Sequence, residues 1–429
     1  MPVIFTSDPI NTSTPPAAIH KSMDTNKLRQ ELTDMYSTKK FAMEYGGYLS
    51  NHLLHGVVAL FELGASKEQI EGFAEHYAKE KLVAIDPDHE DPYEVMGVEA
   101  TSDSHDAAIP SPERVKELLG KREDFDALLA FYGHEVKLLG ADGAVQKHLP
   151  GLVGGLCGAL LHGLIQLGYS YHIGGDRLIA EGLAYFHFSY LSFDDHDAQK
   201  REQSIEKKQF TREEAVSLAH ALKNHEFILS EVHKQLETKT FEDLSIGSYQ
   251  RKLNAVSAHP ERGSVAAFQL IASTLDQYDL SNLNGEFALD FALWLYDMIE
   301  HNDFVIAHAV TSAWSLKQVE HLLNQEDLVR AWRVWLHVAI SAFILQDVSD
   351  LSAQDICDHA AVELPTLDSW EETIARALAL EGYPDEHVYK VVQVAHDHAA
   401  IGSTNKRSFL SQEEREFVAR KAAIKVVAL

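Results

Sequence analysis

The sequence predicts an all-α protein: a single large helical domain of about fifteen helices without internal repeats. Apolar residues recur at spacings of three and four through nearly every segment, whereas the apolar–polar alternation typical of strands is scarce. Hydroxyl-bearing residues and prolines stand where helices would begin. No period of 20–50 residues repeats, which disfavours a solenoid.

Capping signals locate the predicted helix starts. Ser66–Gln69, Thr211–Glu214 and Ser411–Glu414 have the spacing of capping boxes, in which the hydroxyl accepts a hydrogen bond from an unpaired amide of the first turn. Pro112 and Pro384 stand at or near the first position of two further helices. In chain order the predicted helices are 22–45, 49–63, 66–83, 111–120, 122–139, 151–168, 176–191, 211–236, 262–278, 285–301, 304–322, 325–346, 367–381, 384–400 and 411–427.

Two segments differ from this helical pattern. Residues 1–20 are rich in Ser, Thr and Pro and lack the features of a signal peptide, so we expect a disordered tail before an all-helical domain that covers 21–429. Within that domain, the acidic segment 82–113 contains no positively charged residue. It is either a solvated loop or a lid over a site.

Charge and cysteine content exclude several classes of protein. There are 37 Lys and Arg against 65 Asp and Glu, a formal charge of -28, which opposes binding to nucleic acid or anionic membranes because those contacts need cations. The two cysteines, Cys157 and Cys357, lie far apart and form neither a disulfide framework nor a thiolate zinc site. The longest uncharged stretch, 148–175, contains Pro150 and several histidines, as a buried helix would rather than a membrane span. We expect a cytoplasmic protein with a small-molecule partner.

A search for catalytic motifs removes further classes. No two glycines stand two residues apart, so the dinucleotide fingerprint is missing, and Walker A and GxSxG are absent too. HExxH and ExxH are also absent, which excludes zincins and carboxylate-bridged di-iron bundles. His89–Asp91 and His301–Asp303 have the HxD spacing of a facial triad, but the first lies in the acidic segment and the second spans a helix junction.

Histidine is unusually abundant, with 24 residues in the chain. Four of them, His52, His162, His308 and His387, lie within apolar, helix-patterned segments instead of on charged faces. Each alone is explained by a buried imidazole bonded to a carbonyl group. The four together point to a site.

The segment 384–400 adds a lysine to this set. At about 100° per residue, Lys390 falls about 60° from His387 on the valine-rich face, and His396 points the opposite way. A lysine on an apolar face loses hydration, so it needs a carboxylate partner, a lowered pKa or a route for its amine to solvent. The functional alternative is that Lys390 is neutral or chemically modified and works in the site.

Four runs of sequence resemble, in order, the landmark segments of the questin oxidase-like family. They are NHLLHGVVALFELGAS, LLHGLIQLGYSY, IAHAVTSAWSL and PDEHVYKVV, and together they span most of the chain. That family oxidises polyketide aromatics such as anthraquinones, with ring cleavage as its characteristic outcome. The resemblance implies an all-helical oxygenase that holds a mononuclear non-haem iron.

The resemblance also implies the residues of the site. Carried over by motif position, the iron ligands are His52, His162, His308, His387 and carboxylated Lys390, with His387 and Lys390 as the catalytic pair. A lysine ammonium has no lone pair, but its CO2-derived carbamate is an anionic oxygen donor, which suits Fe(II) beside imidazoles. The implied partners are O2 and a small hydroxylated aromatic or quinone. The family is also associated with NADPH-dependent oxidation, although the chain shows no nucleotide motif.

Several alternatives stay open at this stage. His55, His337 and His396 lie near the matched segments and are candidate replacements for a ligand. A helical metal-dependent phosphohydrolase and a non-catalytic helical scaffold are the competing function classes. The phosphohydrolase is suggested by three His-Asp pairs, His105–Asp106, His196–Asp197 and His396–Asp397.

An oxygenase acting on aromatic rings needs an aromatic pocket, and the chain offers candidates for its lining. They are Trp294, Tyr296, Trp314, Tyr169, Tyr171, Phe186 and Phe188.

Overall fold

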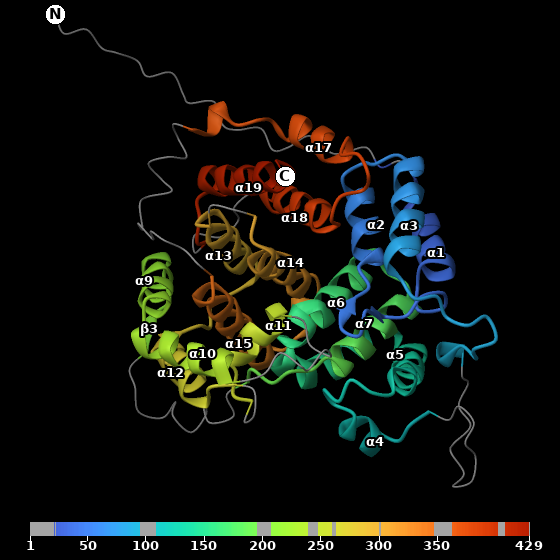
Figure 1. The fold of residues 1–429 in the computed structure, drawn as a ribbon, viewed down its shortest axis with the longest axis horizontal. Helices are drawn as coiled ribbons and strands as arrows, with labels where there is room; N and C mark the ends of the chain where they lie inside the picture. The colour runs from blue at the N-terminus through green and yellow to red at the C-terminus, as the bar shows by residue number, and fades with distance from the viewer. Residues whose placement is uncertain are drawn as a thin grey trace, which may run out of the picture.

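The computed structural model describes residues 21, 23–94, 109–194, 207–238, 248–259, 263–299, 302–346, 363–401 and 408–428. The described chain is predominantly α-helical, as predicted, and its strands are only two residues long (Figure 1). The predicted tail 1–20 and the middle of the predicted acidic lid, 95–108, lie outside the described residues. In the described start of that acidic segment, Asp91 forms an ion pair with Arg177 of the helical domain.

The first half of the chain forms seven α-helices, three short 3-10 turns and one hairpin within the described residues. The prediction of a helix over 22–45 is wrong beyond Met35. Glu44–Tyr45 (β1) pairs antiparallel with Leu49–Ser50 (β2), and the turn between them uses Gly46 and Gly47 at φ values of 59° and 86°, which glycine adopts readily. The other elements are α1 Thr25–Met35, α2 Leu53–Glu62, α3 Lys67–Lys81, η1 Pro92–Glu94, α4 Pro112–Glu117, α5 Phe125–Leu152, η2 Val153–Gly155, η3 Gly158–Leu161, α6 His162–Ile173 and α7 Asp176–Phe188.

The second half departs from the prediction at two places. The predicted helix 211–236 is two helices, since α9 ends at Lys223 and Asn224, a poor helix former, caps it. The short helix α11 was not predicted. Lys208–Gln209 (β3) pairs in parallel with Tyr278–Asp279 (β4). The helices are α9 Arg212–Lys223, α10 Glu226–Thr238, α11 Ser248–Ala255, α12 Val265–Leu275, α13 Gly285–Asp297, α14 Phe304–Val319, η5 Glu320–Leu322, α15 Gln325–Ile344, η6 Leu364–Thr366, α17 Trp370–Leu378, α18 His387–Ala400 and α19 Gln412–Val427.

The predicted capping boxes are complete at two of the three positions. Ser66 and Ser411 each accept a hydrogen bond from the third amide of their helix, and the side chain at that position accepts one from the backbone amide of the cap residue. Thr211 makes the first of these bonds, to the amide of Glu214, but its hydroxyl donates to Glu213. The three helices begin where the cap signals place them.

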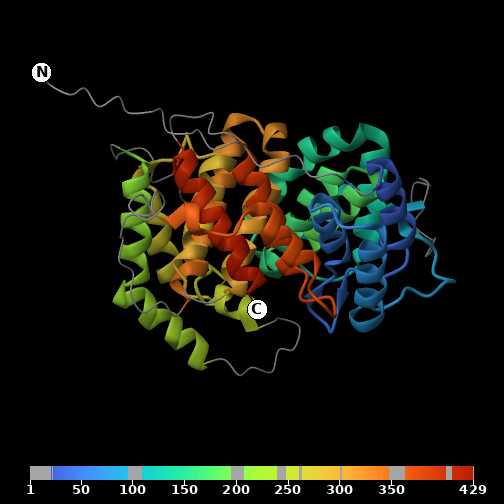
Figure 2. The same ribbon diagram turned by 90° about the horizontal axis from the view of Figure 1, so that it is seen from above.

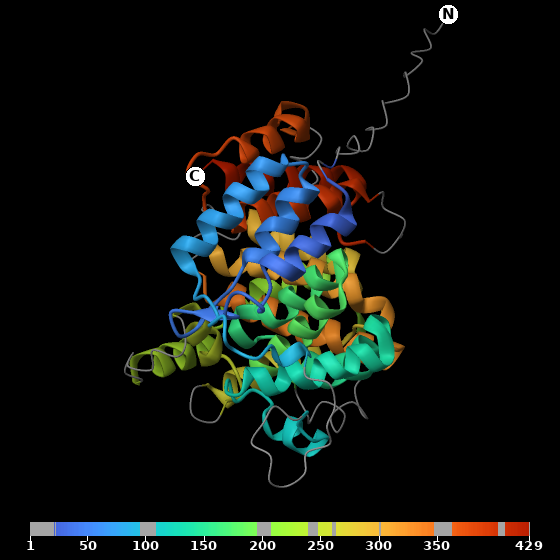
Figure 3. The same ribbon diagram turned by 90° about the vertical axis from the view of Figure 1, so that its right-hand side faces the viewer.

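Four helices from distant parts of the chain, α2, α6, α14 and α18, pack against one another around the centre of the molecule. The views from above and from the side show the N-terminal helices, in blue, beside the C-terminal ones, in red (Figures 2 and 3). Helix α7 packs on α6, and α5 packs on α7. Helices α13 and α19 flank α14 and α18, and all of these helices surround one continuous hydrophobic core. None of the helices in the described ranges has both the length and the apolarity needed to cross a bilayer.

Candidate metal centre

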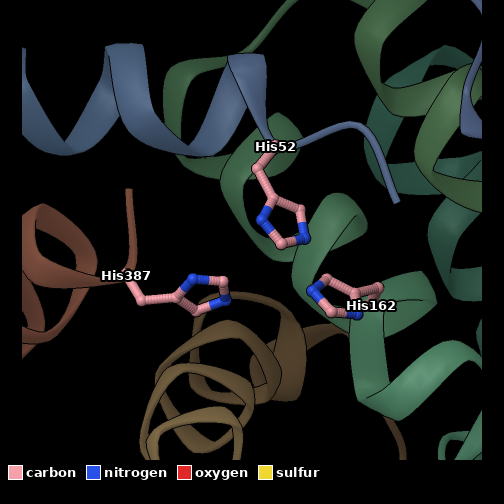
Figure 4. Close-up of side chains that lie close together, drawn as sticks. All are labelled: His52, His162 and His387. Atoms are coloured by element: carbon pink, nitrogen blue, oxygen red, sulfur yellow. The ribbon is translucent and has the colours of Figure 1, made fainter. Parts of the chain in front are cut away.

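The central four helices bring His52, His162, His308 and His387 together. The ring centroids lie 4.3 Å apart for His52 and His162, 4.6 Å for His162 and His308, 4.7 Å for His308 and His387, and 4.9 Å for His387 and His52. Figure 4 shows three of these rings, each from a different segment, pointing toward one another. The histidine cluster, defined by these four residues, therefore unites the four residues that the sequence selected.

Helix boundaries position three of the four rings. His52 is the N-cap residue of α2, and His162 and His387 are the first residues of α6 and α18. His308 lies in the second turn of α14. All four side chains are buried, and that of His308 is completely so.

Two carboxylates orient the rings of His52 and His387. The Nδ1 atom of His52 is hydrogen-bonded to the carboxylate of Glu386, and Nδ1 of His387 is hydrogen-bonded to that of Asp385. Glu386 is itself buried, and its other oxygen accepts a hydrogen bond from Nζ of Lys81 at 3.3 Å. Because a carboxylate accepts, Nδ1 of each ring carries the proton, and Nε2 of the neutral ring is left with its lone pair.

Two backbone carbonyl groups do the same for the other rings. The Nδ1 atom of His162 donates to the carbonyl oxygen of Ala159, and that of His308 donates to the carbonyl oxygen of Phe304. Metal-binding histidines commonly donate their outer N–H to a carboxylate or a carbonyl, which fixes the ring and its tautomer. All four rings of the cluster have this arrangement.

The inner nitrogens face one another. Nε2 of His308 lies 3.1 Å from Nε2 of His162 and 3.1 Å from Nε2 of His387. Nε2 of His52 has no hydrogen-bond partner among the described residues. Lone pairs at this separation repel unless a cation lies between them, and two nitrogens about 2.1 Å from one ion at a right angle would lie about 3.0 Å apart. The residues present therefore fit a metal ion.

Burial and a neighbouring charge keep three of the four imidazoles of the cluster neutral. Burial lowers the pKa of His52, His162 and His308 well below the usual value, and the neighbouring charge of Lys390 lowers each of these pKa values further. An imidazole must be unprotonated at the coordinating nitrogen to bind a metal. His52, His162 and His308 are thus in their metal-binding protonation state at neutral pH.

Lys390 lies one turn after His387 in α18, on the side that the helical spacing predicts. Its side chain is fully buried, and within the described part of the chain Nζ has no hydrogen-bond partner. Burial lowers its pKa to about 8, although Glu386 and Asp385 act in the opposite direction. A buried amine that has no hydrogen-bond partner in the described residues and lies beside the imidazoles is better explained by a role in metal binding than by a structural role.

The turn before His162 has an unusual backbone. Ala159, Leu160 and Leu161 have φ values of 46°, 54° and 69°, a left-handed conformation that non-glycine residues rarely adopt. The side chain of Gln250, from α11, accepts a hydrogen bond from the amide of Leu160. The prediction of a continuous helix over 151–168 is therefore wrong, and the helix begins only at His162. Strained segments of this kind gather at functional sites.

A cavity of about 600 Å³ opens at the histidine cluster. Its wall includes His52, His162 and His387 with the carboxylates of Asp385 and Glu386. The aromatic residues of the wall are Tyr45, Tyr48, Tyr190, Tyr249 and Phe304.

The predicted aromatic lining is wrong. As the described residues form it, the cavity wall contains none of the predicted rings, because those rings lie on helix faces that pack against neighbouring helices. Tyr169, for example, packs on Trp314 with their ring centroids 4.6 Å apart. The residues concerned are Trp294, Tyr296, Trp314, Tyr169, Tyr171, Phe186 and Phe188.

The three additional histidines differ in their relation to the cluster. His55 lies beside it, with its ring centroid 5.4 Å from that of His52, but its Nε2 is within 2.8 Å of the Gln166 side-chain oxygen. The ring of His396 packs against Trp370, at 5.1 Å. His337 packs in a different part of the core. His337 and His396 therefore do not replace a member of the cluster.

The HxD pairs are used elsewhere or lie outside the described residues. Asp91 pairs with Arg177, and His89 lies 3.1 Å from Asp126. Asp303 caps α14, while His301 is not among the described residues.

Of the His-Asp pairs that suggested a phosphohydrolase, His105–Asp106 and His196–Asp197 lie outside the described ranges. Asp397 accepts a hydrogen bond from Gln393, and its neighbour His396 faces Trp370. Within the described ranges, the second group of metal-type side chains, formed by Asp385, Glu386 and His387, shares its histidine with the cluster.

Four residues of the site were missed by the sequence analysis: Asp385, Glu386, Phe304 and Gln250. The two carboxylates stand directly before His387 in the run PDEH, so a search for acidic neighbours of the selected histidines would have found them. Phe304 lies four residues before His308, the spacing at which its carbonyl meets the ring. Gln250 carries no such signal, because tertiary packing alone brings α11 to the turn.

One known protein family matches the part of the chain that contains the cluster. The sequence profile described as questin oxidase-like matches residues 49–395, which includes all four histidines of the cluster and Lys390. No curated protein matches the chain. The family name denotes an oxidase, an oxidoreductase whose partners are a small substrate and oxygen. Because the match extends over most of the chain, the protein belongs to the questin oxidase-like family.

Proposed function

We propose that the protein is a mononuclear non-haem iron oxygenase that inserts oxygen from O2 into a hydroxylated aromatic or quinone ring and cleaves that ring. The substrate class is the anthraquinone-like polyketides. The ligands would be His52, His162, His308 and His387, with Lys390 as its carbamate. One observation carries the proposal: four buried imidazoles form a cluster beside a cavity, and Nε2 of His308 lies 3.1 Å from Nε2 of both His162 and His387.

The donor set favours iron among the common metals. Imidazoles with one anionic oxygen donor suit Fe(II), whereas a structural zinc site would use thiolates or a closed tetrahedron. Iron bound there would supply the one-electron chemistry that lets O2 react with a closed-shell aromatic ring.

In this proposal, residues of the protein orient the metal-binding rings and bind the substrate. Asp385 and Glu386 hold the rings of His387 and His52 with their lone pairs inward. The cavity would hold the substrate beside the cluster, while His308 and Lys390 do not line the cavity and are fully buried from water.

Lys390 supports the proposal through its environment. Carbamate formation joins the neutral amine nitrogen to the carbon of CO2 and releases one proton, so it requires the uncharged amine. The lowered pKa of Lys390, about 8, makes that form far more abundant than for a lysine in water. The resulting anion would lie where Nζ now has no hydrogen-bond partner in the described structure.

Elemental analysis of the purified protein by ICP-MS tests the metal. We expect about one iron per chain, and we expect His387→Ala to lose it because one of the converging donors is removed. His396→Ala is the matched control: this buried histidine of the same helix faces Trp370, so its replacement should leave the iron content unchanged.

Turnover distinguishes the competing functions. Consumption of O2 with a hydroxylated anthraquinone, measured with and without NADPH, supports the oxygenase and defines its need for a reductant. Release of phosphate without O2 consumption would favour a phosphohydrolase instead. A protein that binds no metal even after anaerobic loading with Fe(II) would be a helical scaffold, and the proposal would be wrong.

A further inference from the structure

Phe304 is the aromatic side chain at the junction of the cavity and the histidine cluster. It is the first residue of α14 and lines the cavity. Its ring centroid lies 4.5 Å from that of His308 and 4.6 Å from that of His387. The bond that orients His308 uses the backbone carbonyl of Phe304, so the ring itself is not needed for that bond.

Tyr249 continues this aromatic surface away from the cluster. It lies in α11, lines the same cavity and stacks on Phe304 with the ring centroids 5.0 Å apart and the planes inclined by 29°. Its side chain is 42% exposed, which is unusual for a stacked aromatic residue and leaves much of the ring open to a ligand. The two rings thus form a continuous aromatic part of the cavity wall, which extends from two members of the cluster to the partly exposed Tyr249.

We propose that Phe304 and Tyr249 form the platform on which a planar substrate ring binds next to the metal centre. The proposal rests on the function proposed above and identifies the residues that select a flat aromatic substrate. Aromatic rings gain stabilisation from offset stacking at centroid distances of roughly 4.5–7 Å, beyond the burial of apolar area. A planar polycyclic ring gains this stabilisation on the platform, and its edge is then brought close to His308 and His387.

Equilibrium binding of alizarin, a planar dihydroxylated anthraquinone, tests the platform. The titration follows quenching of protein fluorescence, both in the protein as purified and after removal of metal, so that chelation by the metal does not contribute. Phe304→Leu and Tyr249→Leu should each raise Kd by about three- to tenfold, the loss of one stacking interaction. Tyr249→Phe retains the ring and should change Kd by less than about twofold.

Phe227→Leu is the matched control, because Phe227 is a 45% exposed aromatic residue of α10 that does not line the cavity. It should leave Kd unchanged, and all variants should keep the wild-type thermal midpoint and iron content. Unchanged affinity in both leucine variants at the platform overturns the inference. Iron without any affinity for alizarin also overturns it but leaves the metal proposal intact. Alizarin binding to a protein that holds no iron as purified and takes up none on loading with Fe(II) contradicts the metal proposal alone.

Discussion

The buried environment of Lys390 determines which chemical form of its side chain is favourable. The helical spacing places it on the same face as His387, and the fold buries that face completely. A protonated amine there would face four buried imidazoles with no hydrogen-bond partner in the described residues, which is a costly arrangement for a charge. In the proposed metal site, a carbamate at this position would be attracted to the bound cation, whereas an ammonium would be repelled by it.

Replacing Lys390 with alanine should weaken iron binding by roughly tenfold or more, because an anionic donor is lost from the set. The space left by the side chain should accept a small carboxylate, so formate should restore part of the iron content measured by ICP-MS. In zinc-loaded protein prepared with ¹³C-bicarbonate, NMR should show a carbamate carbon signal in the wild type. That signal should be absent from Lys390→Arg. A wild-type signal that persists in the arginine variant would contradict the assignment.

At the scale of elements, the turn η3 determines where His162 points. Three left-handed residues reverse the chain so that α6 starts at His162 and the Ala159 carbonyl meets its ring. Gly158 begins this turn against the loop after α7, where an added Cβ would lie 1.5 Å from the Ser189 carbonyl oxygen. The turn therefore depends on a glycine at this position because of space.

Gly158→Ala should destabilise the protein by about 3 kcal/mol, because the backbone of Ser189 must move to admit the methyl group. It should also lower the retained iron, since the shift moves His162. Gly151→Ala is the matched control: a Cβ at Gly151 meets no described atom within 4 Å, and alanine in a helix stabilises by roughly 0.5–1 kcal/mol. Urea unfolding with ICP-MS measures both effects, and equal stability of the two variants would refute the role of the turn.

At the scale of the whole molecule, histidines couple stability to pH. His337 is completely buried between Phe193 and Phe268, and neither of its ring nitrogens has a hydrogen-bond partner among the residues described. Burial lowers its pKa to about 3. Between about pH 6.5 and pH 3, the unfolded chain therefore binds a proton at this residue while the folded protein does not. The free energy of unfolding falls as the pH falls through this range.

His337→Leu should remove this contribution. Between pH 6 and pH 4, the wild type should lose up to about 1.4 kcal/mol of unfolding free energy per pH unit more than the variant does. Urea unfolding of metal-free protein at several pH values measures the difference without interference from metal loss. His134→Leu, at an exposed position, is the control and should follow the wild type. Parallel curves for the wild type and His337→Leu would show that His337 protonates in the folded state.

Local patterns were sufficient for much of this protein. The helical class, most helix starts and the burial of four histidines follow from apolar spacing and caps, because an amphipathic helix and its first turn are short-range structures. The common side of His387 and Lys390 follows from helical geometry alone, since three residues make nearly one turn. The family resemblance selected the same four histidines, and the match over residues 49–395 confirms that family.

Other features depend on contacts between residues far apart in the chain. Three features differ from the predictions because they depend on packing partners: the end of α1, the left-handed turn before His162 and the cavity wall. Gln250 accepts a hydrogen bond from the turn, and Phe304 and Tyr249, not the predicted tryptophans, line the cavity. The orientation of each buried imidazole of the cluster likewise depends on the carboxylate or carbonyl group that forms a hydrogen bond with its Nδ1 atom. Local sequence periodicity assigned the residues to helices. The assembly of the four imidazole rings into one cluster needed the packing of α2, α6, α14 and α18, because hydrophobic burial brings together faces that are hundreds of residues apart.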